Sequence, residues 1–552
     1  MEHLQETKMV SILFTWSCRN GNAVVYNYRH GISGFAARLS ADEAHLIAQR
    51  PGVVSVFPDP IFSDYNSSSY ASDDTIIGIL DSGIWPDSDM TPIPSRWKGI
   101  CMEGPDFNCN RKIIGARVYN DPQGPTTKSN SPRDEDGHGT HVAVTAAGRA
   151  VQSVSYHGLA NGTAKGGSPG SRIAVYKVCS VFGCAGSSIL AAFDDAIADG
   201  VDILSLLLGT IEFKIDAIAI GAFHAVANGM TVVCSAGNGG PSLGSVVNDA
   251  PWILTIATTT IDRDFESDVV MGDKTVIKGE AINFANIQKS PVYPLIYSKA
   301  AKKANANCYP DSLNKTLVEG RIVLCEYVDS SEVQSLGGVG VISVDDMTRS
   351  MADTYGTFPT TEQFKRCCQG LFIHQLNKPD ISTPGVDILA AWNGNDTGPT
   401  PKGEPVFSII SGTSMSCPHI SGVAATVKSK YPTWSPSMIR SAIMTTAFQT
   451  NNLKEPMTTH SGSIATPYDY GAGEVSISGP LNLGLVYETT TIDYLNFLCY
   501  YGYNESTIQI IASATAANFT CPQELSKDLT SNKYQLPINT SFKFIMKTNQ
   551  EN

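Results

Sequence analysis

Four polar residues far apart in this sequence have the side-chain types needed for nucleophilic catalysis: Asp81, His138, Asn238 and Ser414. A serine hydroxyl becomes a nucleophile when an imidazole takes its proton and a carboxylate orients that imidazole. An amide side chain can donate a hydrogen bond to the oxyanion that then forms. The order along the chain is therefore acid, base, amide donor and nucleophile, provided that the fold brings the four residues together.

Ser414 lies in the stretch 411–419, where a glycine and small hydroxyl residues precede a run of small apolar residues. This pattern predicts a buried helix, with Pro418 in the first turn, where a missing N–H group costs nothing. Unpaired N–H groups at a helix start can stabilise a developing negative charge. On its own, the pattern is more typical of a helix-capping serine, so the base and the acid must come from elsewhere.

Asp81 and Asn238 each follow a short apolar run. Residues 75–80 are continuously apolar and β-branched, which is typical of a strand buried on both faces of a parallel sheet. Residues 231–235 form a similar run shortly before Asn238. Open parallel sheets place their sites at the carboxyl ends of strands. Asp81 alone is equally compatible with a turn former ahead of Gly83.

His138 and His141 are three residues apart and follow carboxylates at positions 134–136, which permits a metal-site interpretation. No third ligand follows at the spacing of zinc proteases, and the neighbouring glycines fit a tight turn better. We therefore favour a catalytic histidine at position 138 and expect no metal ligand there.

Strand-like and helix-like segments alternate through the middle of the chain, at 172–178, 187–199, 201–208, 215–228, 231–235 and 252–257. Such alternation predicts a parallel sheet flanked by helices. Residues 23–57 form a separate α+β pattern, with strands at 23–26 and 52–57 and a helix at 41–50. A polar segment, residues 63–74, separates the two and reads as a linker.

The composition indicates a globular protein: 552 residues are 42% hydrophobic and 16% charged. A formal charge of -13 argues against nucleic acid or an anionic membrane as a partner, and no apolar run approaches the roughly 18 residues of a spanning helix. The N-terminus carries Glu2 and Glu6 ahead of a short apolar run and shows no clear export signal.

Thirteen cysteines are too sparse for a disulfide scaffold and too scattered for a zinc site. The pairs Cys101 with Cys109 and Cys179 with Cys184 are close enough to be bridged, although free buried thiols would fit equally well. Glycosylation motifs, which matter only in an exported chain, occur at Asn66, Asn161, Asn314, Asn395, Asn504, Asn518 and Asn539.

In four motifs the chain resembles the plant subtilisin-like serine proteases (subtilases, peptidase family S8), whose Asp, His, Ser order it shares. The motifs are Gly78-Ile79-Leu80-Asp81-Ser82-Gly83-Ile84-Trp85-Pro86, Asp136-Gly137-His138-Gly139-Thr140-His141, Cys234-Ser235-Ala236-Gly237-Asn238 and Ser411-Gly412-Thr413-Ser414-Met415-Ser416-Cys417-Pro418-His419. The resemblance implies a subtilisin-like α/β fold and a serine endopeptidase that needs no metal or other cofactor.

The same resemblance assigns the roles. Ser414 would attack the scissile carbonyl after His138 takes its proton, Asp81 would orient His138, and Asn238 with the Ser414 N–H would form the oxyanion hole. The substrate cleft would be lined by Ser205, Leu206, Leu207, Leu208 and Gly209. Partners would be protein or peptide substrates and the chain's own propeptide, in a monomer or homodimer outside the cell (apoplast or cell wall).

The resemblance also divides the chain. Residues 1–62 would be an I9-like inhibitor propeptide whose first strand has no counterpart before Ala23, 63–74 a linker, and 75–505 the catalytic domain. Residues 295–360 would be a shortened protease-associated (PA) insert, and 506–552 a truncated segment ahead of an absent fibronectin-III-like domain.

Two departures from the family pattern bear on activity. Leu207 stands where the family has serine, and a bulkier side chain there would narrow the pocket. Residues 362–376 replace an expected segment, which would leave the sheet poorly closed. The alternative is thus a catalytically impaired subtilase-like protein that binds peptides or a partner.

Overall fold

The computed structural model describes residues 74–522 with gaps, together with strands and two helical residues nearer the N-terminus. The gaps are 86–92, 105, 120–130, 181–182, 210–216, 241–243, 264, 285–291, 303–307, 327–329, 346–354, 357–358, 365–377, 395–405, 460–461, 483–485 and 513–518. The chain divides into two compact units, Met1–Ser69 and Tyr70–Asn552.

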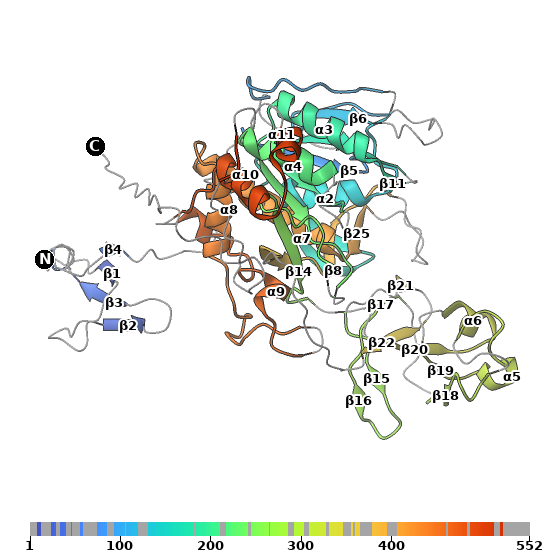
Figure 1. Cartoon of the computed structure of the whole chain (residues 1–552). Helices are drawn as coiled ribbons and strands as arrows, with labels where there is room; N and C mark the ends of the chain where they lie inside the picture. Colours follow the sequence, from blue (N-terminus) through green and yellow to red (C-terminus); the bar gives the residue numbers. More distant parts are fainter. Residues whose placement is uncertain are drawn as a thin grey trace, which may run out of the picture. The chain divides into compact units, whose positions relative to one another are not determined.

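The larger unit is built on a seven-stranded sheet with the order β6-β9-β5-β12-β13-β14-β23. Three of these strands, β5, β6 and β14, are labelled in Figure 1. The strands are β5 (Ile76–Asp81), β6 (Ile113–Val118), β9 (Arg172–Lys177), β12 (Ile203–Leu206), β13 (Thr231–Ser235), β14 (Leu254–Thr259) and β23 (Ile381–Pro384). All neighbouring pairs are parallel, as the alternating pattern predicted. The strand order reverses direction at β5, so the carboxyl end of β5, where Asp81 lies, is the expected position of a site.

Helices cover both faces of this sheet, and each face has its own apolar core. In β5, Ile76 and Leu80 join one core while Ile77 and Ile79 join the other, which explains why the run is continuously apolar. The first core includes α3 (Gly186–Asp199), α4 (Ala217–Ala227), α10 (Thr491–Tyr500) and α11 (Glu505–Ala512). The second includes α2 (His138–Ala147), α7 (Thr413–Lys430) and α8 (Pro436–Thr445).

The N-terminal unit holds a four-stranded sheet with the order β2-β3-β1-β4. Its strands are β1 (Lys8–Ile12), β2 (Val24–Tyr28), β3 (Gly34–Leu39) and β4 (Val56–Pro58). The expectation that no first strand precedes Ala23 is wrong, because β1 pairs antiparallel with both β3 and β4. Of the predicted helix at 41–50, Glu43 and Leu46 are helical and the rest lies outside the described residues, as does the linker apart from Asp74.

Between β14 and β23 the chain forms a second, smaller parallel sheet with the order β18-β19-β20-β22. Its elements are β18 (Leu295–Tyr297), α5 (Lys315–Val318), β19 (Ile322–Cys325), α6 (Ser330–Ser335), β20 (Gly340–Asp345) and β22 (Thr360–Phe364). This sheet has an apolar cluster of its own. Most of the segment 362–376 lies outside the described residues, yet β23 pairs with β14 at four positions, so the large sheet extends to its seventh strand and the expected poor closure is not seen there.

Short strands and two short helices complete the larger unit. They are β7 (Val151–Tyr156), β8 (Leu159–Ala164), β10 (Cys179–Ser180), β11 (Gly183–Cys184), β15 (Val269–Val270), β16 (Val276–Ile277), β17 (Ile282–Asn283), β21 (Tyr355–Gly356), β24 (Ile388–Ala391), β25 (Phe407–Ile410), α9 (Pro467–Tyr470) and η2 (Gly479–Leu481). No helix in the described part of the chain is both long and apolar enough to span a bilayer.

Both suggested cysteine pairs are disulfides in the structure, Cys101–Cys109 and Cys179–Cys184. Two further disulfides, Cys308–Cys325 and Cys499–Cys521, join residues 17 and 22 positions apart, for which sequence spacing gave no signal. Among the described cysteines, Cys234 and Cys417 are not disulfide-bonded and are buried in the two cores.

Candidate active site

Asp81 and His138 are in direct contact at the carboxyl end of β5. The Nδ1 atom of His138, the first residue of α2, lies 2.8 Å from Oδ1 of Asp81. The Asp81 side chain is 2% exposed and that of His138 is 31% exposed, so the imidazole has a buried and an open side. In a neutral ring, a carboxylate on Nδ1 keeps the proton there and leaves the lone pair of Nε2 free to accept a proton.

Three carboxylates surround this imidazole and favour its charged form. Burial lowers the pKa of His138, but the charge and hydrogen bond of Asp81, together with the charges of Asp136 and Asp134, outweigh burial and raise the pKa to about 9. His138 is thus a strong base that is largely protonated at neutral pH.

His141 does not share a ligand site with His138. Its Nε2 lies 2.9 Å from the carbonyl oxygen of Ile388, inside the protein, and burial lowers its pKa to about 3. No group of three or more metal-ligating side chains occurs among the residues that the structure describes. His141 is therefore a neutral core histidine.

Ser414 is the second residue of α7 and is partly exposed. The neighbouring N–H groups are engaged: Thr413 donates to Asn238, and Met415 donates to the carbonyl of Gly412. Within the described residues, the Ser414 N–H has no acceptor in the protein, so it is a first-turn donor available to a bound group.

The predicted position of Pro418 in the first turn is wrong, because α7 begins at Thr413 and Pro418 is its sixth residue. Proline lacks an N–H, so the carbonyl of Ser414, four residues earlier, has no helical donor. The helix starts before the proline because Thr413 is held from outside, by Asn238.

The Asn238 amide is locked against the start of α7. Its Oδ1 accepts from the N–H of Thr413 at 2.9 Å and from the Thr413 hydroxyl at 2.8 Å. Because a backbone N–H can only donate, the accepting atom must be the oxygen, which directs Nδ2 away as a donor. A Cβ atom at Gly412, whose φ is +153°, would lie 3.2 Å from that Nδ2, so glycine keeps the approach open. Sequence reasoning did not predict that Thr413, which adjoins Ser414, holds the Asn238 amide in place.

The pair of Asp81 and His138 and the pair of Asn238 and Thr413 lie at the same edge of the sheet. Asp81 ends β5, Asn238 follows the end of β13, and the N–H of Gly412 donates to the carbonyl of Gly385, just beyond β23. Helices α2 and α7 also share one core on one face of the sheet. The structure thus brings the amino ends of both helices, carrying His138 and Ser414, to the carboxyl edge.

The predicted cleft residues do not all face a surface. The side chains of Ser205 and Leu206 are fully buried, and the cleft prediction is wrong for these two. Ser205 accepts a hydrogen bond of 2.8 Å from Ser421 of α7, while Leu206 packs in the opposite core, because adjacent residues of a strand face opposite sides. Leu207 is 7% exposed, Leu208 is half-buried and Gly209 is exposed, so only the last residues of this segment reach the surface.

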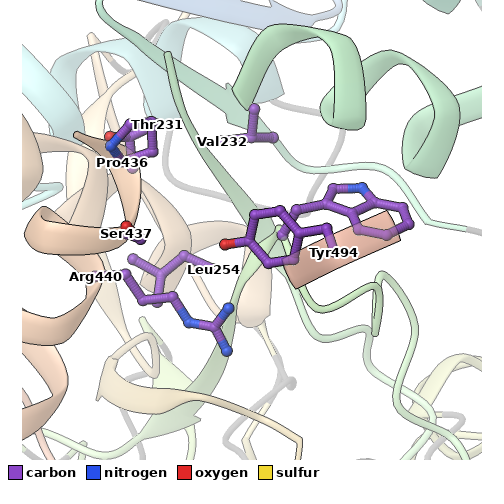
Figure 2. A pocket seen from close by; sticks show the side chains of 8 residues that line it. Thr231, Val232, Leu254, Pro436, Ser437, Arg440 and Tyr494 are labelled. Atoms are coloured by element: carbon purple, nitrogen blue, oxygen red, sulfur yellow. The ribbon is translucent and has the colours of Figure 1, made fainter. Parts of the chain in front are cut away.

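A small cavity lies at the amino ends of β13 and β14 (Figure 2). It is lined by Thr231, Val232, Trp252, Leu254, Pro436, Ser437, Arg440 and Tyr494, and it has room for about one water molecule. Figure 2 shows the Arg440 side chain extending toward the ring of Tyr494. Arg440 also pairs with the buried Asp380, which pairs in turn with Lys378. Arg440 thus links the lining of this cavity to a buried ion-pair network, and neither Asp81 nor His138 lines the cavity.

Most of the chain is similar to known proteins. Residues 72–473 match the subtilase family and residues 5–63 match the peptidase inhibitor I9 family. The chain is 51% identical to the "CO(2)-response secreted protease" of Arabidopsis thaliana, over 93% of this chain and 78% of that protein. It is 45% identical to the Arabidopsis "Subtilisin-like protease SBT5.1", over 95% of this chain and 79% of that protein.

The inhibitor match covers the four-stranded N-terminal unit, so the chain carries its own inhibitor domain ahead of a catalytic domain for protein substrates. The subtilase match covers the seven-stranded sheet and the four residues at its edge. The chain therefore belongs to the subtilase family and is a subtilisin-like serine endopeptidase.

Proposed function

We propose that this endopeptidase cleaves protein substrates through an acyl-enzyme on Ser414. His138 takes the proton from the Ser414 hydroxyl as the oxygen attacks the scissile carbonyl, and later gives it to the leaving amine. Water then hydrolyses the ester by the same route. The observation that carries the proposal is the 2.8 Å contact between Asp81 and His138 at the sheet edge that also receives the start of α7.

In this proposal the oxyanion is stabilised by two donors, Nδ2 of Asn238 and the N–H of Ser414. Support comes from the two hydrogen bonds of Thr413 that fix the Asn238 amide, so the donor is oriented before substrate binds. Leu207, in place of serine, is 7% exposed and packs in the core shared with α2 and α7, so its bulk is directed inward.

The test is covalent labelling of the folded full-length chain by a fluorophosphonate probe. We expect labelling of the wild type, loss of labelling in Ser414→Ala, and the probe mass on the peptide that contains Ser414. Circular dichroism and melting temperature should be the same for the wild type and Ser414→Ala, which shows that both are folded. If the folded wild type then fails to label, the result would favour the peptide-binding alternative.

The domain limits are part of the proposal: a propeptide at 1–62, a linker at 63–74, a catalytic domain at 75–505 and a C-terminal segment at 506–552. The small parallel sheet with its own apolar cluster supports a PA-like insert at 295–360. N-terminal sequencing of the mature enzyme should place its first residue within or next to 63–74, and a start elsewhere would contradict the limits.

We further propose an extracellular location, in the apoplast or cell wall. Support comes from the name of one relative, a secreted protease, and from four disulfides among the described residues, which persist in oxidising compartments. Fractionation of tissue that expresses the chain should place the mature form in the extracellular fluid.

A further inference from the structure

Asp134 is a buried carboxylate with an unusually complete set of hydrogen bonds. It lies four residues before His138 and is 1% exposed. Its Oδ1 accepts from the Ser82 hydroxyl at 2.9 Å, the Gly137 N–H at 2.9 Å and the Asp136 N–H at 3.1 Å. Its Oδ2 accepts from the N–H and the hydroxyl of Thr140, at 2.8 and 2.6 Å.

The donors belong to the two segments that carry Asp81 and His138. Ser82 follows Asp81 directly, donates to Asp134, and accepts from the Gly139 N–H at 2.9 Å. The residue before His138, Gly137, occupies the N-cap position of α2 and has no side chain to cap the helix. Asp134 and Ser82 supply the acceptors instead, so the N–H groups of Gly139 and Thr140 are both satisfied from outside the helix.

The backbone of Asp134 is held independently of its carboxylate. The N–H of Asp134 donates to the carbonyl of Ile84, and the N–H of Ile84 donates to the carbonyl of Pro132. Lys177, which pairs with Asp81 in the sheet register, donates to the carbonyl of Arg133 at 2.7 Å. Residues 132–134 are therefore anchored to the ends of β5 and β9, and a change of the side chain alone leaves these anchors in place.

We propose that Asp134 is a positioning residue of the peptidase reaction: its carboxylate joins Ser82 to the first turn of α2 and thereby fixes Asp81 against His138. This inference rests on the proposed function, in which those two residues are catalytic. Asp134 does not touch substrate. Asp134 determines the position of the His138 imidazole when the imidazole takes the proton of Ser414.

The decisive change is Asp134→Asn, because it keeps the shape and removes an acceptor. Every partner of the carboxylate is a donor, so an amide NH₂ group would face donors at one of its two positions and break the bonds there. The matched control is Asp199→Asn. Asp199 is 3% exposed and accepts from Arg117 and from the Tyr176 hydroxyl, in the other core.

The experiment measures kcat and KM of the full-length enzyme across pH, with a fluorogenic peptide and active sites titrated by a fluorophosphonate. Misplacement of a catalytic group by about 1 Å costs on the order of 10²-fold, so Asp134→Asn should lower kcat by about that factor with KM little changed. Ser82→Ala should lower kcat less, and the double variant should match Asp134→Asn because both residues act through one link.

The pH profile separates positioning from general destabilisation. The Asp134 charge and the Asp81 contact both favour protonated His138, so the acid limb of kcat/KM should move to lower pH in Asp134→Asn. Asp199→Asn should lower the melting temperature and leave kcat and the acid limb unchanged.

The inference is overturned if Asp134→Asn folds and behaves like Asp199→Asn in kcat and acid limb. Should Asp134→Asn fail to fold, Ser82→Ala carries the test, and an unchanged kcat in that variant overturns it. Failure of the proposed function looks different, because wild-type protein itself would then neither turn over peptide nor label at Ser414.

Discussion

The pH dependence of this enzyme should follow the protonation of His138. The imidazole acts as a base only when neutral, and its surroundings raise its pKa to about 9. At pH 7 roughly 1% of the free enzyme then carries neutral His138, and at pH 9 about half does. We therefore expect kcat/KM to rise roughly tenfold per unit between pH 6 and 8 and to level off above about pH 9.

Asp136 offers a perturbation that leaves the triad intact. Its exposed carboxylate contributes to the raised pKa of His138, so Asp136→Asn should move the midpoint of kcat/KM to lower pH. Solvent screens an exposed charge, so a shift of a few tenths of a unit is expected, shrinking as salt is added. Asp195→Asn, in α3, adjusts the net charge equally and should leave the midpoint unchanged.

The assay is the initial rate at substrate concentrations far below KM, at constant ionic strength, with the rate of fluorophosphonate inactivation measured in parallel. Both rates should give the same midpoint. A midpoint at or below about 6.5, the ordinary pKa of histidine, would refute the reasoning, as would an upward shift in Asp136→Asn.

The stability of the folded protein should fall as pH rises, whereas kcat/KM should increase. Protonated His138 paired with Asp81 stabilises the folded state fully below the unfolded pKa of about 6.5, and this contribution is lost as pH rises through about 9. The thermal midpoint of Ser414→Ala, which cannot digest itself, should show a decline over this window that Asp81→Asn lacks. An equal decline in both variants would assign the loss to other groups.

Three further changes test separate features. Asn238→Ala should lower kcat by about 10²–10³ with little change in KM, and an unaltered kcat would remove Asn238 from the oxyanion hole. Arg440→Met leaves the buried Asp380 with one cation fewer and should lower the free energy of unfolding by about 3 kcal/mol, seen as a lower denaturant midpoint; an unchanged midpoint would contradict this. Asn248 donates to the carbonyls of Leu208 and Ser235 at 2.7 and 2.9 Å, and its φ is +56°. Asn248→Gly therefore keeps the backbone conformation but removes both hydrogen bonds, and it should broaden the cleavage selectivity measured with a peptide library. A selectivity profile identical to that of the wild type would show that the segments at Leu208 and Ser235 keep their positions without these hydrogen bonds.

The sheet could be expected from local patterns in the sequence, whereas the contact between Asp81 and His138, which are 57 residues apart, could be expected from the resemblance to the subtilases. A continuous apolar run such as 75–80 is buried on both faces, and the residue that ends it lies at the carboxyl edge. The glycines around His138 permit the close approach of α2 to the strand end: a Cβ atom at Gly139 would lie 2.3 Å from the carbonyl oxygen of Gly83.

Other features, such as the start of α7 and the burial of Ser205, depend on contacts between distant segments, for which the sequence carries no local signal. The start of α7 is set by Asn238, 175 residues before Thr413, which is why Pro418 lies deeper in the helix than expected. Ser205 reads as a cleft residue by resemblance, yet its hydroxyl meets Ser421, 216 residues later. Strand β1 has only five residues and is defined by its pairing with β3 and β4.

The adjacency of β14 and β23 has a consequence for how such chains can diversify. Ile256 lies opposite Ile381 and Thr259 lies opposite Pro384, so the chain leaves the sheet at the carboxyl end of β14 and re-enters it at the amino end of the neighbouring strand β23. The entropy of closing a loop grows slowly with its length, so lengthening or shortening that excursion costs the sheet little. The segment between β14 and β23 can therefore be replaced during evolution, while the strand ends that carry the active-site residues keep their register.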